Sequence, residues 1–330
     1  MSQHSSTTAR RVRVAVLTYR RPADLAQLLP RLVEQARAVS DFGTIADVLV
    51  VDNDPTRSAA ALVGAFLAGP GDVEVHYEHE PVPGIAAARN RALRTAAAVD
   101  LLVFIDDDER PCPDWLPLLL DTHARHRGAA VVGPVVSQFA VPPPDWVTAG
   151  RFFDRLRRPT GSLVTVAATN NLLLDLHEVR RLGCEFDQEF GLSGGSDTLF
   201  TRQLHRAGGR LVWCDEAVVT DVVPPERATR SWVLRRALRS GNSWSRTTLA
   251  LAATPAARLP ARLRLTAAAV ARLLAAAART VVGLTARSQA QRARGARTAA
   301  RGLGLLLGAW GYVYQEYRRP PTPPTARRGP

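Results

Sequence analysis

A run of five apolar residues followed by three aspartates constrains the fold of this 330-residue chain more than any other feature. The apolar run spans residues 101–105, and Asp106, Asp107 and Asp108 follow it directly. An unbroken apolar run of this length, ended by polar residues, is typical of a strand that is covered on both faces of a sheet. Ligands of open α/β sheets bind at the carboxyl ends of the strands, so these aspartates are expected at a binding site.

Three adjacent carboxylates repel one another, and their coexistence needs a physical reason. A hard divalent cation such as Mg²⁺ or Mn²⁺ supplies one, because it takes oxygen ligands and shares its remaining positions with phosphate groups. The alternative is a solvated acidic turn after a strand, since short aspartate runs are common in loops. The rest of the sequence favours the first interpretation.

Strands and helices alternate along the first two-thirds of the chain. Strand patterns at 12–17, 46–51, 73–77 and 101–105 are separated by helical patterns, which predicts an α/β domain with a mostly parallel central sheet flanked by helices. Further short strands are expected at 131–136, 163–168, 171–174, 210–214 and 217–223. The dinucleotide-binding motif and the P-loop motif are both missing, so neither of those two classes is indicated.

Two glycine-containing turns are each expected to lead into a helix beside a ligand. Pro83 and Gly84 precede a helix that begins with small residues, and the N-terminus of a helix favours phosphate. Gly194, Gly195 and Ser196 precede Asp197, which places a carboxylate at the start of another helix. The plainer interpretations are a tight loop in the first case and an N-cap aspartate in the second.

The net charge of +13 belongs to the last third of the chain. Residues 1–221 contain 23 Arg and 28 Asp plus Glu, a net of −5, whereas residues 222–330 contain 20 Arg and 2 Glu, a net of +18. All 43 basic residues are arginine, which together with the abundant alanine indicates a GC-rich genome. Arginine content alone is therefore no signal for nucleic acid, and no recognisable nucleic-acid-binding module accompanies it.

The basic tail contains amphipathic helical patterns. In the pattern at 258–287 leucine and valine lie on one face and arginine on the other, and the uncharged segment 302–314 carries three aromatic residues. We expect residues 226–318, which include a further helix at 228–246, to form a basic helical region on an anionic membrane surface. Packing on the rest of the chain, or dimerisation, is the alternative.

Targeting and redox features point to the cytoplasm. The N-terminus lacks the apolar core of a signal peptide, and no run reaches the roughly 18 uncharged apolar residues of a spanning helix. The three cysteines are isolated and expected to be reduced. We therefore expect a cytoplasmic protein, peripheral at the inner face of the plasma membrane, with disordered ends at 1–11 and 319–330.

Five short motifs stand in the order found in one enzyme family. They are Val-Leu-Thr-Tyr-Arg-Arg, Val-Val-Asp-Asn-Asp, Pro-Gly-Ile-Ala-Ala-Ala-Arg-Asn, Phe-Ile-Asp-Asp-Asp-Glu and Gly-Gly-Ser-Asp. Over residues 12–225 the chain resembles the inverting family 2 glycosyltransferases, which have the A-type nucleotide-sugar-binding fold. The resemblance implies a catalytic domain over this range that moves a sugar from a nucleotide-diphosphate sugar to an acceptor hydroxyl with inversion. It also implies Mg²⁺ or Mn²⁺ as cofactor and a saccharide or lipid-linked acceptor of cell-envelope polysaccharide.

The same resemblance implies roles for particular residues. Asp197 would be the general base, with Gly194, Gly195 and Ser196 on the acceptor side. Asp106 and Asp108 would bind the metal, with Asp221 at a position where many relatives have histidine. The nucleotide-sugar would contact Thr18, Tyr19, Arg20, Asp52, Asn53, Gly84, Arg89, Asn90, Asp106 and Asp107.

Two departures from the family pattern bear on the acceptor. Ser196 replaces the glutamate of the common Glu-Asp pair, which removes one potential acceptor contact. The Gln-x-x-Arg-Trp motif of processive synthases is missing, which favours transfer of a single sugar.

Two other functions stay open at the level of sequence. A sugar-nucleotide nucleotidyltransferase has a similar sheet but normally needs a glycine-rich N-terminal loop, and residues 17–21 contain no glycine. A non-catalytic, membrane-associated nucleotide-binding scaffold would have no chemical need to keep both the aspartate cluster and Asp197. The sequence leaves the sugar, the nucleotide, the acceptor and the oligomeric state undetermined.

Overall fold

The computed structural model describes residues 9–40, 43–69 and 71–315. The first strand begins at Arg10, so the expectation of disorder through residue 11 is wrong for Arg10 and Arg11, which pair with Thr44 and Ile45 of the next strand. Residues 1–8 and the tail at 319–330, which were also expected to be disordered, lie outside the described residues.

An eight-stranded sheet forms the centre of the molecule, in the order β3-β2-β1-β4-β9-β6-β10-β8. Its strands are β1 (Arg10–Thr18), β2 (Thr44–Asp52), β3 (Val75–His79), β4 (Leu101–Asp106), β6 (Ala130–Val132), β8 (Leu163–Val164), β9 (Asn171–Asp175) and β10 (Leu211–Trp213). Strands β1 to β4 run parallel to one another, and β10 runs parallel to β6, whereas β9 is antiparallel to β4 and β6 and β8 is antiparallel to β10. The predicted mostly parallel sheet is thus confirmed, and the antiparallel strands lie in its second half.

A second, three-stranded sheet consists of β5 (Glu109–Pro111), β11 (Val219–Val223) and β7 (Val135–Phe139). The single strand expected at 131–136 is wrong, because β6 and β7 belong to different sheets and are separated by Gly133 and Pro134. Proline cannot donate to a strand ladder, and a Cβ at Gly133 would lie 2.3 Å from the side chain of Asn171, so the chain is confined as it changes sheet. The strand expected at 163–168 ends at Val164.

Helices cover both faces of the large sheet, and each face has its own apolar core. The flanking helices are α1 (Pro22–Ser40), α2 (Ala60–Leu67), α3 (Ile85–Thr95), α4 (Trp115–His126), α6 (Leu176–Arg181) and α7 (Ser196–Arg206). The short helix α5 (Asp145–Ala149) packs instead against the C-terminal helices, and two 3₁₀ turns are η1 (Gln188–Phe190) and η2 (Pro225–Arg227). Leucines of α1 pack with Trp115 of α4 in one core, and alanines of α3 pack with Phe200 of α7 in the other. This confirms the expected α/β fold and fixes where the strands end.

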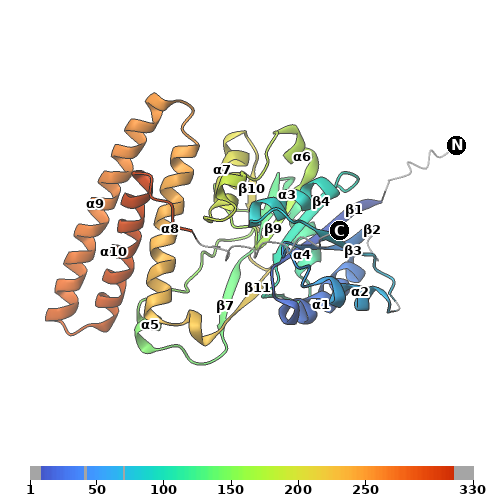
Figure 1. Cartoon of the computed structure of the whole chain (residues 1–330), viewed down its shortest axis with the longest axis horizontal. Coiled ribbons are helices and arrows are strands. Elements are labelled where there is room, and N and C mark those ends of the chain that lie inside the picture. The colour runs from blue at the N-terminus through green and yellow to red at the C-terminus, as the bar shows by residue number, and fades with distance from the viewer. Residues whose placement is uncertain (1–8, 41–42, 70, 316–330) are drawn as a thin grey trace, which may run out of the picture.

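Three long helices form a separate layer beside the sheet, visible at the left of Figure 1. They are α8 (Arg230–Ala250), α9 (Pro255–Thr285) and α10 (Gln289–Ala309), and α10 lies between the other two. Close packing of α8 on α10 depends on glycine, since a Cβ at Gly304 would lie 1.9 Å from the carbonyl oxygen of Leu238. The apolar segment expected at 302–314 is mostly the end of α10, whose Arg- and Ala-rich beginning gave no clear apolar periodicity.

The two faces of α9 differ in what they contact. Its buried residues are small or single apolar side chains that face the helical layer: Ala261, Leu265, Ala269, Ala276 and Gly283. The predicted leucine and valine face lies outside the layer, with Leu263 56% and Leu274 66% exposed. By length and composition α9 is the one described helix that could cross a membrane, although core helices of soluble proteins meet the same criteria.

Candidate active site

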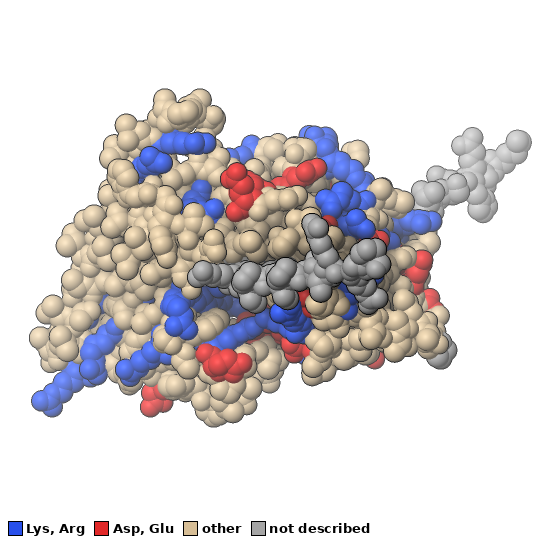
Figure 2. Space-filling model, in the orientation of Figure 1, with Lys and Arg blue, Asp and Glu red and all other residues tan. Residues whose placement is uncertain are grey.

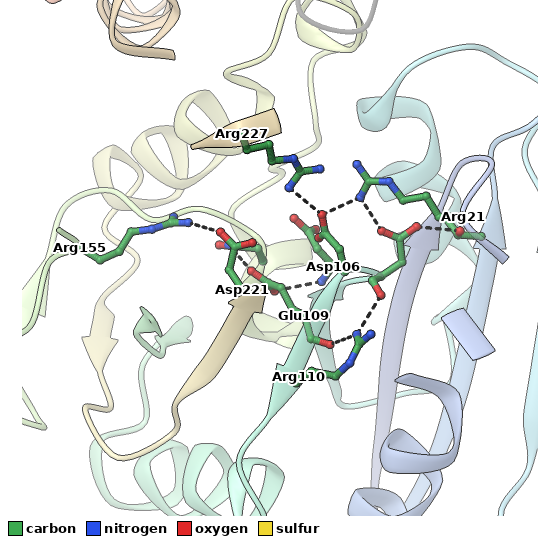
Figure 3. A network of polar contacts seen from close by, with 11 residues as sticks. Arg21, Asp106, Glu109, Arg110, Arg155, Asp221 and Arg227 are labelled. Atoms are coloured by element: carbon green, nitrogen blue, oxygen red, sulfur yellow. Dashed lines mark hydrogen bonds and ion pairs between the residues drawn. The ribbon is translucent and has the colours of Figure 1, made fainter. Parts of the chain in front are cut away.

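A cavity of about 670 Å³ opens where the carboxyl ends of β1 and β4 face α8. Residues from β1, α3, the β4–β5 turn, α7, β11 and α8 line it. Figure 3 shows the carboxylates and arginines that meet in this region. The prediction from strand order, that ligand-binding side chains gather at this sheet edge, agrees with the position of the cavity.

Five carboxylates converge on one side of the cavity, from two segments that are far apart in sequence. Asp106 ends β4, Asp107 and Asp108 form a turn, and Glu109 begins β5. Strand β5 pairs antiparallel with β11, and this register sets Asp221 directly opposite Glu109. The resemblance to the family grouped Asp221 with the metal ligands, and the small sheet that brings it to the aspartate cluster was not predicted.

Arginines pair with this cluster from three directions (Figure 3). Arg21 lies 2.9 Å from Asp107 and 2.8 Å from Asp108, and Arg227 lies 3.0 Å from the same oxygen of Asp108. Arg155 lies 2.9 Å from Asp221. The site therefore carries acidic and basic groups in close alternation, which suits a ligand with both a bound cation and phosphate groups.

Burial strongly disfavours charge on the cluster. Burial above all, opposed by the charge of Arg89 and reinforced by Asp108 and Asp107, raises the pKa of Asp106 to about 7. Burial likewise raises the pKa of Asp107 to about 6, against the effect of Arg21. The pKa of Glu109 is raised well above its usual value by burial and by Asp106 and Asp108. Burial is the largest of these causes for all three carboxyl groups.

The donor chemistry of the cluster fits a hard divalent cation. Every potential ligand is a carboxylate oxygen, the type that Mg²⁺ and Mn²⁺ prefer. Asp106 lines the cavity, and no side chain in the described part of the molecule donates a hydrogen bond to its carboxylate. Among the described residues no three His, Cys, Asp or Glu side chains are arranged as a ready-made metal site, because Asp108 and Asp221 turn toward arginines.

Polar groups after β1 and β2 line the opposite side of the cavity. Thr18 donates a 2.8 Å hydrogen bond to Asp107, and Tyr19, Arg20 and Asn53 lie beside it in the lining. Arg20 has a left-handed backbone with φ of 57°, which turns the chain sharply at the end of β1. Four of the residues expected to contact the nucleotide are therefore at the cavity.

Arg89 and Asp197 face the cavity from α3 and α7. Arg89 is 7% exposed and donates a 2.6 Å hydrogen bond to Ser196, while its Nε is buried without an acceptor. Asp197 lies in the first turn of α7, and Gly195 is the N-cap residue. The alternative that Asp197 is an N-cap is therefore wrong, and its carboxylate is available at the cavity wall.

Other predicted site residues lie behind the lining rather than in it. Asp52 is 0% exposed, and its carboxylate accepts hydrogen bonds from the backbone of Asp54 and Ala59 and from Tyr77. Asn90 is hydrogen-bonded to the backbone of Phe186. Gly84, Gly194, Gly195 and Ser196 are also absent from the described lining. These residues hold the loops in place, and direct contact with a ligand stays a prediction for them.

Several lining residues were not foreseen from the sequence. Arg21, Glu109, Arg155, Asn170, Arg227, Trp232, Arg236 and Arg239 belong to this group. Arg21 directly follows the first motif and could have been included with it. The last three lie on α8, in the tail that was expected to be separate, so the cavity draws on both sides of the expected boundary at residue 225.

Comparison with known proteins identifies the family. The family model described as glycosyl transferase family 2 matches residues 13–175. The chain is 37% identical over 233 residues to the succinoglycan biosynthesis protein ExoM of Rhizobium meliloti (strain 1021), an alignment that covers 71% of this chain and 74% of that protein. The chain belongs to glycosyl transferase family 2. It is thus a glycosyltransferase, as the motif order implied.

Solved structures show the same fold in more distant proteins. The glycosyltransferase resembles S. aureus TarS 1–349 in complex with UDP, with a TM-score of 0.52 at 16% identity over 92% of this chain and 93% of that one. It also resembles the UDP-GlcNAc complex of TarS 1–349, with a TM-score of 0.51 at 15% identity over 88% and 90% of the two chains. GalNAc-T7 with UDP, GalNAc and Mn²⁺ matches with a TM-score of 0.50 at 12% identity over 75% and 52%.

Proposed function

We propose that this glycosyltransferase moves one sugar from a nucleotide-diphosphate sugar to an acceptor hydroxyl with inversion, using a divalent cation. One observation carries the proposal. A single cavity joins a cluster of five carboxylates, several arginines and the separate carboxylate of Asp197 at the carboxyl ends of the strands. The reaction needs a cationic environment for a diphosphate and a free base elsewhere, and the cavity offers both.

The carboxylate cluster would hold the cation through Asp106 and Asp108, with Asp221 as a further oxygen donor. A bound Mg²⁺ or Mn²⁺ would offset the charge that develops on the departing diphosphate. Arg21 and Arg227 are placed to bind phosphate oxygens once Asp108 turns to the cation, because both now contact that carboxylate. Arg89, with its buried and unpartnered Nε, supplies a further donor on the α3 side.

Asp197 is our candidate for the general base. It has no ion-pair partner among the described residues, whereas Asp107, Asp108 and Asp221 each contact an arginine. It lies in the first turn of α7, at the end of the helix toward which the backbone N–H groups point. An ionised carboxylate on a wall apart from the metal ligands can accept the proton of the acceptor hydroxyl as that oxygen attacks the sugar.

The comparisons support a choice of substrates for the first experiments. The structures of TarS contain UDP or UDP-GlcNAc, so a uridine nucleotide is the donor class to test first. The relationship to a succinoglycan biosynthesis protein supports a saccharide acceptor, free or lipid-linked, in polysaccharide assembly. It favours glycosyl transfer over the nucleotidyltransferase and scaffold alternatives.

We further propose that residues 12–225 form the catalytic domain and that residues 226–318 attach it to the cytoplasmic face of a membrane. The outer face of α9 supports this proposal, because its leucines and valines are exposed. On the opposite face, Leu265 packs against apolar residues of α10 and α8. Leu259, Leu263, Val270, Leu274 and Val281 form this outer face. A helix lying in the interface plane buries such a face among lipid chains. Because α8 lines the catalytic cavity, the attached surface would remain close to the reaction.

Titration calorimetry with UDP, GDP and dTDP, each with and without Mn²⁺, tests the proposed function. We expect one diphosphate to bind, with an affinity that rises at least tenfold when the metal is present. Binding of none of the three by folded protein would contradict the nucleotide-sugar proposal. Equal binding with and without Mn²⁺ would contradict the role of the cation and leave the donor class standing.

A further inference from the structure

A second cavity, of about 440 Å³, lies between the helical layer and the segment that follows α5. Arginines from two helices converge on it, Arg272 and Arg279 from α9 and Arg294, Arg297 and Arg301 from α10. Figure 2 shows basic side chains at the lower left of the molecule, over the lower ends of α9 and α10 beside α5. The only acidic residue in the described lining is Asp154.

The charges in this cavity are poorly balanced from within the chain. Asp154 pairs with Arg151, and Arg297 donates hydrogen bonds to the backbone carbonyls of Gly150 and Arg151. The other four arginines, Arg272, Arg279, Arg294 and Arg301, make no ion pair with any described residue. The Nε of Arg294 is buried without a hydrogen-bond acceptor. Four guanidinium groups thus share a cavity with no anion assigned to them.

Close packing of the two helices brings these charges together. A Cβ at Gly302 would lie 3.2 Å from the Cβ of Arg272, and one at Gly295 would lie 3.5 Å from the Cβ of Arg279, so glycine allows the arginine stems to cross the interface. Partial burial, together with the charges of Arg272 and Arg297, lowers the pKa of Arg301. Like charges held this close destabilise the layer unless a counter-charge enters.

A general excess of arginine does not explain the cluster. Arg272 and Arg279 are themselves exposed, but so are many alanine positions of α9, for example Ala275, Ala277 and Ala278. An arginine placed only for solubility could occupy any of them at no electrostatic cost. The arginines that line the cavity are instead spaced seven residues apart on α9, and three and four residues apart on α10. These spacings keep them on one face of each helix.

We propose that this cavity binds a phosphate-bearing anion. Guanidinium groups bind phosphate oxygens in pairs of parallel hydrogen bonds, and several of them together suit a phosphomonoester or a diphosphate better than a single carboxylate. The phosphate belongs either to a lipid headgroup or to a soluble molecule. The site is separate from the catalytic cavity, and the segment between them contributes to both, since Arg151 and Asp154 line the second cavity while Phe153 and Arg155 line the first.

A matched pair of variants of the full-length enzyme tests the proposal. Arg294→Gln/Arg301→Gln removes two charges from the cavity, and Arg258→Gln/Arg264→Gln removes two exposed charges from α9 outside it. Metal-free calorimetry with inorganic pyrophosphate measures binding of a soluble anion. Flotation with phosphatidylcholine vesicles, with and without phosphatidic acid, measures binding to a lipid phosphate. Both variants keep the catalytic cavity, so pyrophosphate bound there contributes equally.

We expect the cavity variant to lose at least tenfold in affinity relative to the control variant in one arm or both. A loss in the vesicle arm alone assigns a lipid headgroup, and a loss in the pyrophosphate arm alone assigns a soluble phosphate compound. Should the double variant fail to fold, Arg279→Gln provides the same comparison with one charge removed. Equal binding by the cavity and control variants in both arms would overturn the proposal, whatever the outcome of the donor titrations.

Discussion

The two cavities of this glycosyltransferase are both rich in arginine, yet their charges are arranged in opposite ways. In the catalytic cavity Arg21, Arg155 and Arg227 each contact an aspartate, so the arginines are held in place before a ligand arrives. In the cavity of the helical layer Arg294 and Arg301 have no acidic partner among the described residues. Arginines paired with aspartates can exchange partners when a cation and a diphosphate bind. Arginines without an acidic partner can bind an anion directly, with no ion pair to break.

The difference also shows that the role of an arginine depends on its position in the fold. Arginines at the sheet edge come from a turn, a loop and a 3₁₀ helix, and each reaches a carboxylate of the β4–β5 turn or of strand β11. Arginines of the helical layer come from two facing helices whose only acid nearby is exposed. Substitutions in the two regions should therefore have different consequences.

The largest effect on activity is expected at Asp197, whose carboxylate pairs with no arginine of the described residues. Asp197→Asn removes the proposed base and should lower kcat by about 10³-fold, within the range typical of general bases. Nucleotide binding should stay within about twofold of the wild type, because the substitution is isosteric. Kinetics and calorimetry on the same preparation measure both, with Asp145→Asn as a control at an exposed aspartate outside the cavity. A loss of nucleotide binding equal to the loss of activity would make Asp197 a structural residue.

A smaller effect, on nucleotide affinity, is expected at Asp108, which pairs with two arginines and is a proposed ligand of the cation. Asp108→Ala removes one oxygen donor and frees Arg21 and Arg227, so the gain in nucleotide affinity from Mn²⁺ should fall by about 10²-fold. Affinity without metal should stay equal or rise, because two guanidinium groups lose a competing carboxylate. Calorimetry with and without Mn²⁺ measures the nucleotide affinity in each condition, and therefore the gain that the metal provides. An undiminished metal effect would remove Asp108 from the set of ligands.

The two faces of α9 give a comparison within the helical layer. Leu265 is 7% exposed, and Leu265→Ala should lower the free energy of unfolding by about 2 kcal/mol through lost packing. Leu263→Ala/Leu274→Ala, at residues 56% and 66% exposed, should leave stability unchanged and weaken binding to anionic vesicles about tenfold. Thermal unfolding and vesicle flotation measure the two effects. Unchanged flotation of the double variant would show that the membrane attaches elsewhere, if at all.

The smallest effect is also the most direct test of the contrast between the cavities. Arg21→Gln leaves the carboxylate of Asp107, whose side chain is 5% exposed, without its cationic partner. We expect the free energy of unfolding to fall by about 1 kcal/mol. The expected loss is small because the side chain of Arg21 is 39% exposed, and solvent screens its charge. Arg294→Gln removes only repulsion and should leave that free energy equal or higher, within about 0.5 kcal/mol. Urea unfolding in phosphate-free buffer measures both. Equal losses would mean that the two cavities do not differ in this way.

Much of the catalytic site could be predicted because it depends on local sequence. The apolar run before Asp106 located the aspartate cluster at the sheet edge, and the resemblance to the family implied that Thr18 and Asn53 lie there too. Asp197 was found from its glycine-rich turn. The strand expected at 131–136 failed for a non-local reason, because the two short strands there pair with partners in different sheets.

Only the tertiary structure decided which charges meet. Pairing of β5 with β11 carries Asp221 to the cluster, and the seating of α8 on the sheet edge brings Trp232, Arg236 and Arg239 into a cavity whose other lining residues fall between Leu17 and Arg227. The sequence by itself determined the α/β fold, the family and the acidic sheet edge, because strand order and short motifs encode them. The second cavity depends on packing of α9 against α10, which glycines allow, and the arginine pairs of the sheet edge depend on loops that meet the β4–β5 turn and β11. No periodicity along the chain encodes either contact.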